Sequence, residues 1–523
     1  MQIVKITIGN YRSIREVPFQ IEGRDDSSFT YGLIGINEAG KSSILKAIGL
    51  KDGIVDAVGT KMPLSKDFRA KEEIRVTFTY KISQTNNKEI YEIINKQVVP
   101  PDSEEPVDDN STTVEDEANQ TKDTETNEVT EPISNDLLIE YQVSFATASS
   151  SPVNTITIYD GENPIDVNKQ EFEACFIKNV HKTIFWTAED RYLISKPINI
   201  EQFVADTSVS IPLRNCFLLS SIQECEIGQK LEEALADTTD CEELELTLGD
   251  SVTAHIKSAW PNHPIKITFK IMDGHINFHV KDVDTKGKAQ TSDMRSDGFK
   301  QFVSFLLTIA AENINEELEN TILLLDEPET HLHPKAQEYL LTQLIGITKN
   351  NKNNLVFFAT HSNYMIDKND LGRYYRVSKT KDEKKEEYTQ AHQFNTKQTS
   401  YAEVSYDVFD ILDEQYHNEL YDKLRDWFVR DKNSKETDES KHIETLGINS
   451  FDDQYLKQVK KADQNYPDTS KPKNSNSKVT LPTYIRNCIH YPTNKENDFE
   501  TRLKSSIEIL RQYVKEAGEV SST

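Results

Sequence analysis

The chain has 523 residues, a formal net charge of −27 and a mean hydropathy of −0.63, so it is polar and acidic. No apolar run approaches the roughly 18 residues that a membrane-spanning helix needs, and the first residues lack a signal-peptide pattern. Five scattered cysteines without a C-x-x-C pair fit a reducing compartment and argue against structural zinc. We expect a cytoplasmic protein of two or three domains, without a membrane contact and without a uniformly basic surface for nucleic acid.

The beginning of the chain has the pattern of strands around one helix. Residues 3–8 and 74–81 alternate between two faces, as strands do, and residues 31–34 form a short apolar run that suits a buried strand. A helix is predicted for residues 42–50. A strand, a turn and a helix are therefore expected in succession near residue 40.

A strongly acidic segment follows. Residues 101–136 hold 13 acidic side chains against one lysine and almost no apolar residue, which predicts a disordered insertion. Strand patterns resume at 139–146 and 154–159, so the segment is expected to interrupt a sheet rather than to separate two domains. Because the segment concentrates negative charge, a local basic groove elsewhere remains compatible with the composition.

Residues 199–290 are expected to form a helical and hairpin subdomain. Helical patterns occur at 200–204, 213–222, 227–236 and 242–260, and a hairpin is predicted for 265–280 across Asp273-Gly274. Strands at 321–325 and 355–359 then alternate with helices at 297–313, 333–348 and 362–367. This alternation predicts an α/β fold with a mostly parallel sheet.

The composition changes after about residue 394, where Tyr, Asp, Lys and Asn become frequent. Helical patterns occur at 401–412, 415–428, 481–491 and 498–517, whereas residues 431–480 are polar and predicted to be rich in loops. We therefore expect a head domain over residues 1–393. A mainly α-helical region over 394–523 would dock a partner or carry an effector site.

One motif predicts a phosphate-binding loop. The segment Gly35-Ile-Asn-Glu-Ala-Gly40-Lys41-Ser42 matches G-x-x-x-x-G-K-S/T and lies between a predicted strand and a predicted helix. The glycines permit a tight turn whose N–H groups converge on phosphate, Lys41 neutralises the β- and γ-phosphates, and Ser42 is a ligand for Mg²⁺. The alternative is a glycine-containing turn without a ligand. The predicted contacts to nucleotide are Gly35, Asn37, Glu38, Ala39, Gly40, Lys41, Ser42 and Ser43.

A second motif places two carboxylates at the end of an apolar strand. In Ile322-Leu-Leu-Leu-Asp326-Glu327 the carboxylates follow the strand directly, and a parallel sheet delivers such residues to its ligand-binding edge. Asp326 is predicted to hold Mg²⁺ and Glu327 to polarise the attacking water. The alternative is a strand that ends in a solvated acidic turn.

Two weaker motifs accompany these. Ser296 and Gly298 open a predicted helix, where they form an anion site or an ordinary helix cap. His361 ends the next predicted strand, where it hydrogen-bonds a γ-phosphate or packs in the core. Spacing alone favours the helix cap for the first motif and does not decide the second.

The order of the four motifs resembles ABC-type ATPases such as the heads of RecF, SMC and OLD proteins. Asp326-Glu-Pro-Glu-Thr-His-Leu-His-Pro334 in particular resembles the RecF/OLD-like branch, the AAA-15 and AAA-21 ATPases. Ile8-Gly-Asn-Tyr-Arg12-Ser-Ile14 resembles the opening of that branch, and this adds Arg12 to the nucleotide contacts. The resemblance covers roughly residues 1–380 outside the acidic segment.

This resemblance implies a P-loop ATPase that uses ATP and Mg²⁺ and forms a homodimer or a higher even-numbered oligomer. One protomer would supply Lys41, Ser42, Asp326, Glu327 and His361, with Lys41, Glu327 and His361 as the catalytic residues. The other protomer would supply Ser296 and Gly298. Glu329, His331 and His333 fall in the segment where the family has its dimer-contacting loop, and two imidazoles without a matched carboxylate do not make a metal site.

The chain departs from the family in two respects. No clear glutamine loop is present, so that ligand has no candidate residue. The Toprim motifs of OLD nucleases are also absent after Ala359, so we do not expect a Toprim nuclease.

The C-terminal region carries one distinctive segment. Arg486 and His490 lie four residues apart on one face of a predicted helix, with Asn487 between them. This resembles the Arg-Asn…His pattern of HEPN ribonucleases, although the spacing is one residue too short, and a docking surface is the favoured interpretation. The segment also resembles the tails of PtuA-type ATPases of Septu and retron-associated phage-defence systems, which implies a separately encoded HNH nuclease as partner.

Three functions follow from these observations. The leading hypothesis is an ATPase that oligomerises and regulates a separately encoded nuclease in antiphage defence. The second is a RecF-like DNA-repair ATPase, which would bind DNA with a steep salt dependence. The third is a self-contained ribonuclease that uses Arg486 and His490. A transporter subunit is least consistent with the long tail after the head.

Overall fold

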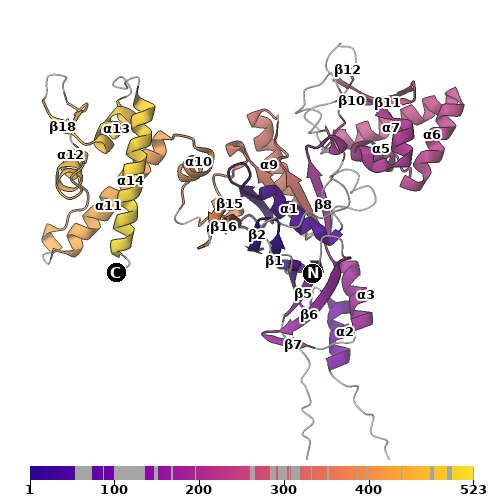
Figure 1. Ribbon diagram of the computed structural model, residues 1–523, viewed down its shortest axis with the longest axis horizontal. Coiled ribbons are helices and arrows are strands. Elements are labelled where there is room, and N and C mark those ends of the chain that lie inside the picture. Colours follow the sequence, from indigo (N-terminus) through magenta and orange to yellow (C-terminus); the bar gives the residue numbers. More distant parts are fainter. Residues whose placement is uncertain are drawn as a thin grey trace, which may run out of the picture. The chain divides into compact units, whose positions relative to one another are not determined.

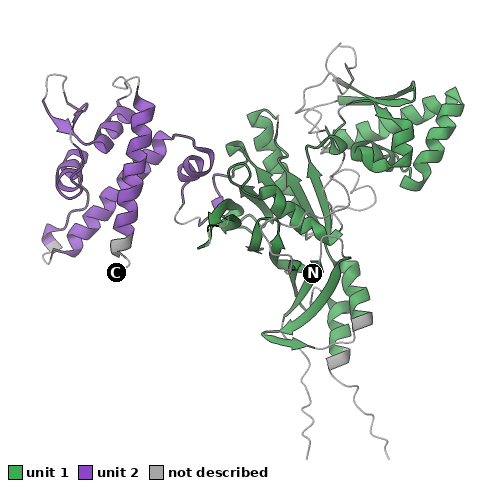
Figure 2. Ribbon diagram, viewed as in Figure 1, with its two compact units in different colours: residues 1–367, 372–394 green, residues 368–371, 395–523 purple. Residues whose placement is uncertain are grey.

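The chain folds as two compact units (Figure 2). Unit 1 comprises Met1–Asp367 and Gly372–Phe394, and unit 2 comprises Lys368–Leu371 and Asn395–Thr523. The computed structural model describes residues 1–52, 73–85, 87–98, 136–145, 151–165, 169–194, 196–259, 265–282, 290–291, 303–304, 307, 319–330, 332–349, 353–383, 385, 387–395, 399–436, 439–463, 465–471, 476–491 and 498–521. The acidic segment 101–136 lies outside these residues except for Asp136.

Unit 1 is built on a mixed sheet of 12 described strands (Figure 1). Their order is β7-β6-β5-β4-β1-β2-β16-β15-β3-β14-β13-β8. The strands are β1 (Gln2–Tyr11), β2 (Ile14–Gln20), β3 (Thr30–Ile34), β4 (Ile74–Ile82), β5 (Leu137–Phe145), β6 (Val153–Asp160), β7 (Asn163–Ile165), β8 (Lys182–Thr187), β13 (Thr321–Asp326), β14 (Leu355–Thr360), β15 (Tyr374–Lys381) and β16 (Glu387–Gln393). The α/β fold predicted from the sequence is therefore confirmed.

One half of this sheet is parallel, and it positions the candidate site. β15, β3, β14, β13 and β8 pair in parallel in that order. Every residue of β3 and β14 is buried, as their short apolar runs require in a sheet that is covered on both faces. Parallel strands end at the same edge, so the loops after β3, β13, β14 and β8 meet there.

The strands from β7 to β2 pair in an antiparallel manner, whereas β2 and β16 pair in parallel. β4 and β5 pair along their whole length, from Ile74 opposite Phe145 to Ile82 opposite Leu137. The two strands that flank the acidic segment are therefore neighbours in one sheet. The helices α2 (Lys88–Val98) and α3 (Lys169–Asn179) belong to this half and contact each other.

Helix α1 (Lys41–Gly49) follows β3 and packs against β1, β8, β13 and β14. Its apolar residues Ile44, Leu45 and Ile48 are fully buried, because they recur at the helical spacing that forms one face. Helix α9 (Pro334–Thr348) follows β13. Proline in its first turn and the His333 ring, which accepts from the Lys335 N–H at 3.4 Å, start this helix.

The subdomain of residues 199–290 has the predicted helices and hairpin. Its elements are β9 (Ile198–Asn199), α4 (Ile200–Ala205), α5 (Ile211–Leu219), α6 (Ile227–Ala236), α7 (Thr238–Ala259), β10 (Ile265–Met272), β11 (His275–Asp282) and β12 (Gln290–Thr291). The β10–β11 turn has positive φ at Asp273 and Gly274, as a two-residue hairpin turn requires.

The structure also corrects the predicted elements. The helix predicted for 362–367 is only a 3-10 turn, Asn363–Met365. β15 and β16 were not predicted, because their polar residues carry no clear alternation. Of the helix predicted for 297–313, only residues 303, 304 and 307 are described, and they are helical.

Unit 2 is a helical body with its own core. It contains α10 (Tyr401–Phe409), α11 (Glu414–Ser434), α12 (Ile448–Phe451), β17 (Tyr466–Pro467), β18 (Lys478–Val479), α13 (Leu481–His490) and α14 (Phe499–Ser521). The segment 431–480 was expected to be loop-rich, yet it contributes Phe451, Tyr455 and Leu456 to this core. Among the described residues, no helix combines the length and apolar character that crossing a membrane requires.

Candidate active site

The loop between β3 and α1 has a backbone path that needs glycine at both ends. A Cβ on Gly35 would lie 2.2 Å from the Val377 carbonyl oxygen. Gly40 has φ 108°, and a Cβ there would lie 2.5 Å from Thr389 Oγ1. No side chain caps the N-terminus of α1, so its first N–H groups and the helix dipole are directed at the loop. This is the geometry of an anion-binding loop.

Lys41 is the first residue of α1, and its side chain is folded into the loop. Its Nζ lies 2.9 Å from the Gly35 carbonyl oxygen, 3.1 Å from the Ile36 carbonyl oxygen and 2.8 Å from His361 Nε2. Burial lowers the pKa of Lys41 to about 8, although Glu327 and two further carboxylates oppose this shift. Within the described residues, the ammonium group therefore has no carboxylate in direct contact, and a phosphate oxygen would stabilise it strongly.

Ser42 and Asp326 lie together beside this loop. The Ser42 hydroxyl donates to Asp326 Oδ1 at 2.9 Å. Burial raises the pKa of Asp326, and the Ser42 bond only partly offsets that shift. A hydroxyl next to a carboxylate suits Mg²⁺, which binds one or two protein oxygens and completes its shell with phosphate oxygens and water. The two residues that the sequence assigned to Mg²⁺ thus fit that ion.

Glu327 is turned toward the same space by its backbone. It has φ 52°, an uncommon conformation for a residue other than glycine, and its N–H donates to the Ala359 carbonyl oxygen at 3.0 Å. Its Oε1 lies 3.1 Å from His361 Nε2. The hydrogen bond with His361 lowers the pKa of Glu327. At neutral pH it is therefore a carboxylate that can orient water, and its basicity is modest.

Arg12 lies beside the first turn of α1. It occupies the turn between β1 and β2 with φ 52°, and its Nη1 donates to Ser43 Oγ at 3.4 Å. Of the other predicted contacts, Ala39 is buried, whereas Asn37 and Glu38 are exposed on the loop. The guanidinium thus places a second positive charge beside the first turn of α1.

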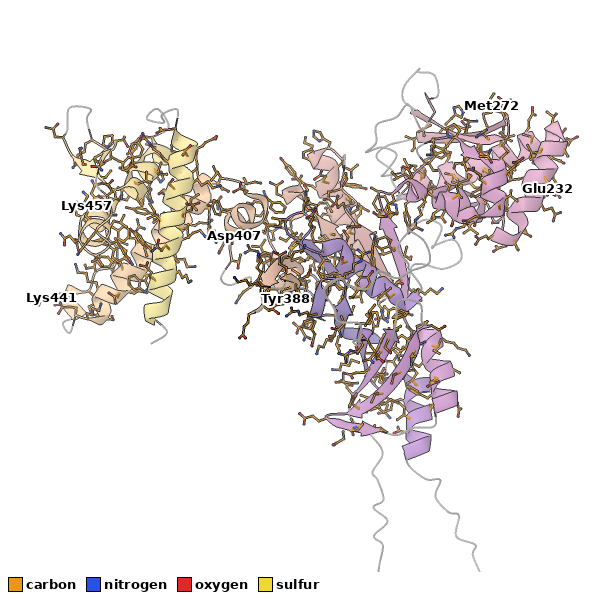
Figure 3. All side chains as sticks on the ribbon, viewed as in Figure 1. Glu232, Met272, Tyr388, Asp407, Lys441 and Lys457 are labelled. Carbon is orange, nitrogen blue, oxygen red and sulfur yellow. The ribbon has the colours of Figure 1, made fainter. Side chains whose placement is uncertain are left out.

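Thr389 supports the loop and carries no motif in the sequence. Its hydroxyl donates to the Ala39 carbonyl oxygen at 3.0 Å and lies 2.8 Å from Ser13 Oγ. Its N–H donates to the Ser13 carbonyl oxygen at 2.7 Å. The residue is fully buried on β16, next to Tyr388, which Figure 3 labels. Only long-range strand pairing brings it to the loop, so no local signal could have identified it.

Other predicted residues are outside the described part of the chain or have structural contacts of their own. Ser296, Gly298 and His331 are outside the described residues. His333 caps α9 rather than facing the loop, and Glu329 is buried behind His361 with 3% exposure. β8, a strand that was not predicted, ends at the same edge and leads to Glu189, whose Oε1 lies 4.0 Å from Lys46 Nζ.

The three tail candidates lie on α13 in unit 2. Arg486 Nη2 lies 3.2 Å from Asp422 Oδ1, and its guanidinium stands 5.4 Å from the centre of the Tyr421 ring. Asn487 is buried, and its amide donates to an Asp468 carboxylate oxygen at 3.5 Å. His490 is exposed. Arg486 and Asn487 thus make contacts that hold α13 in the unit 2 core.

Comparison with known proteins identifies the family of unit 1. The model of the AAA ATPase domain family, AAA_15, matches residues 1–366. An uncharacterized protein of Methanocaldococcus jannaschii, MJECL43, is 28% identical over 123 residues. That match covers 23% of this chain, and it spans about a third, 31%, of the curated relative.

Solved structures show a weak likeness. A chain from the SMC head bound to the C-terminal winged-helix domain of ScpA has a TM-score of 0.36 and 13% identity, and covers 76% of this chain and 99% of that one. The SMC head domain from Thermotoga maritima has a TM-score of 0.33 and 12% identity, with 76% and 100% covered. These scores are too low to support an argument about function. The family match rests on most of the chain, and the protein is therefore a member of the AAA ATPase domain family, AAA_15.

Proposed function

We propose that the chain binds Mg-ATP at the edge of the parallel strands and hydrolyses it with its own residues. The observation that carries the proposal is the convergence of Lys41, Asp326, Glu327 and His361, which come from three different loops. Hydrolysis of ATP needs a held phosphate chain, a metal ligand and an oriented water. The four residues supply a group for each of these requirements.

Each of these residues would have one role in hydrolysis, which follows from its position. Lys41 would neutralise the β- and γ-phosphates, because burial disfavours its charge until an anion arrives. Ser42 and Asp326 would hold Mg²⁺, which neutralises charge on the phosphates. Glu327 would orient the attacking water, and His361, 3.1 Å from its Oε1, would hydrogen-bond the γ-phosphate.

The proposal extends to a head-to-tail dimer around ATP. The segment Ser296-Asp-Gly298 precedes β13 in the sequence, in the order that ABC-type ATPases use for the residues that reach the partner's γ-phosphate. Unit 1 would then have two composite sites per dimer. ATP would hold the protomers together, and hydrolysis would release them.

Unit 2 would transmit the result of ATP binding and hydrolysis to a partner protein. It is compact, and its buried core includes Tyr421, Phe451, Tyr484 and Ile507. Arg486 and Asn487 are engaged within that core, which favours a docking role for unit 2 over a ribonuclease site. We therefore propose that unit 2 binds a separately encoded nuclease, of the HNH type, that the ATPase regulates in antiphage defence.

The test is hydrolysis and binding of ATP by the purified chain and two variants. Lys41→Ala is expected to lose ATP binding, because the phosphates then lack their buried cation. Glu327→Gln is expected to bind ATP normally and to lower the hydrolysis rate at least 100-fold, a typical loss for such a group. Isothermal titration calorimetry and phosphate release measure the two effects.

The same purified proteins also test whether unit 2 is itself a nuclease. Labelled RNA and DNA are incubated with the wild type, Mg²⁺ and ATP, and no cleavage is expected because the nuclease is a separate chain. Cleavage that disappears in Arg486→Ala and His490→Ala would make unit 2 its own effector. Wild-type hydrolysis in Glu327→Gln would show that another residue orients the water.

A further inference from the structure

A buried carboxyl group lies behind the catalytic candidates. Glu329 follows β13, and its side chain is almost fully buried. Its Oε1 accepts hydrogen bonds from the Thr360 hydroxyl and from the His361 N–H, the latter at 3.2 Å. Its Oε2 has no hydrogen-bond partner within the described part of the chain. Burying a carboxyl group with one unpartnered oxygen is costly, so this group is not explained by packing alone.

A second side chain joins the same two segments, the loop after β13 and the turn after β14. Gln337, on α9, donates through Nε2 to the Leu332 carbonyl oxygen at 2.8 Å. Its Oε1 accepts from Ser362 Oγ at 2.5 Å. The loop and the turn are therefore linked on one side by Glu329 and on the other by Gln337.

His361 lies between these links. Its N–H is held by Glu329, while its ring nitrogen Nε2 reaches Lys41 Nζ at 2.8 Å and Glu327 Oε1 at 3.1 Å. A misplacement of about 1 Å at a catalytic group can lower a rate about 100-fold. The position of the imidazole therefore depends on the loop that carries Glu327.

We infer that Glu329 is a positioning residue, whose carboxyl group joins the loop after β13 to the turn after β14 and thereby sets His361 against Glu327. The inference rests on the proposed function, since it concerns how the residues of that site are held in position relative to one another. Movement of the loop would then move His361 and Glu327 together.

The charge state of this carboxyl group makes a specific variant informative. Burial raises the pKa of Glu329, and the nearby Glu327 raises it further, although Thr360 and backbone N–H groups oppose the shift. Glutamine has nearly the same shape, and its carbonyl oxygen accepts from both donors. Glu329→Gln should therefore retain the link, whereas Glu329→Ala removes it.

The experiment measures kcat for ATP hydrolysis and Kd for ATP in four variants of the full chain. Glu329→Ala and Thr360→Val are each expected to lower kcat at least tenfold with Kd within threefold of the wild type. Glu329→Gln should keep kcat within threefold, and so should Glu338→Ala, an exposed carboxylate on α9. The double variant of Glu329→Ala and Thr360→Val should be no slower than the slower single variant, because both remove one link.

The outcomes separate this inference from the proposed function. A wild-type kcat in Glu329→Ala would overturn the inference about Glu329 but not the proposed function, provided that the wild type hydrolyses ATP and Glu327→Gln does not. A wild type without ATPase activity would overturn both. If circular dichroism shows that Glu329→Ala is unfolded, Thr360→Val decides, because it preserves side-chain volume, and wild-type kcat in that variant would count against the link.

Discussion

At the scale of single residues, the site depends on a lysine ammonium group whose pKa lies close to neutral pH. Lys41 has a pKa of about 8 because burial disfavours the ammonium form. It is therefore mostly charged at pH 7 and mostly neutral above pH 9. Phosphate would raise this pKa again, so binding of ATP above pH 8 takes up a proton.

This coupling predicts how ATP affinity changes with pH. Between pH 7 and 8 the affinity should fall about twofold, between pH 8 and 9 about fivefold, and at higher pH the fall should approach about tenfold for each pH unit. The phosphates of ATP do not cause this slope, since a phosphate monoester with a second pKa near about 6 is already ionised there. Calorimetric titration at pH 7, 8 and 9 measures it.

A matched control exists for the titrating group. Lys41→Arg retains its charge throughout this range, since the guanidinium has a pKa above about 12. Its affinity should be lower than that of the wild type but nearly independent of pH. An equal slope in both proteins would assign the effect to another group.

At the scale of elements, strand β16 supports the loop between β3 and α1 by hydrogen bonds. β16 carries Thr389, which bonds Ala39 in the loop and Ser13 in the turn next to Arg12. The same strand ends at Gln393, two residues before the second segment of unit 2 begins at Asn395. The chain therefore leaves unit 1 just after the strand that supports the loop.

Thr389 offers a sharp test of this support. Thr389→Val keeps the shape of the side chain but leaves the Ala39 carbonyl oxygen and Ser13 without their partner. Loss of a buried hydrogen bond costs about 1–3 kcal/mol, so ATP affinity should fall roughly 5- to 150-fold. Thr389→Ser retains the hydroxyl and should stay within threefold, as measured by calorimetry.

The contrast between the two variants is the informative result. Equal affinities for Thr389→Val and the wild type would show that strand pairing alone holds the loop. Equal losses in Thr389→Val and Thr389→Ser would assign the effect to packing of the methyl group instead of the hydroxyl.

At the scale of the whole molecule, the chain combines an ATPase unit with a separate helical unit. The family match ends at residue 366, close to the point where unit 2 contributes its first residues, Lys368–Leu371. The ATPase chemistry thus belongs to unit 1. In the proposed dimer, unit 2 would carry the consequence of hydrolysis to a partner.

The proposed dimer makes a prediction at this scale. With ATP and Mg²⁺, Glu327→Gln should have twice the mass of a single chain by light scattering, and without nucleotide it should be a monomer. Ser296→Arg in the same background should abolish this change, because a bulky cation would replace the small group that meets the partner's phosphate. Monomers at every ATP concentration would contradict the head-to-tail arrangement.

Local motifs were enough to predict much of the candidate site. The loop from Gly35 to Ser42, the carboxylates Asp326 and Glu327, and His361 each follow a strand pattern within a few residues. Hydrophobic runs such as Ile322–Leu325 also predict buried parallel strands, because a strand that is covered on both faces consists almost entirely of apolar residues. The α/β class followed from the order of these runs.

The tertiary structure decided what distant segments do together. Thr389 reaches the loop across the chain, and Glu329 is buried because β14 brings Thr360 and His361 to it. β15 and β16 have no clear alternation, yet pairing with β3 and β2 places them in the sheet. The sequence by itself thus determined the motifs of the candidate site and the fold class, since a motif holds its groups within a few residues. Only the tertiary structure decided which buried residues hold those groups in position, because these contacts join residues that are 31 to 350 positions apart in the sequence.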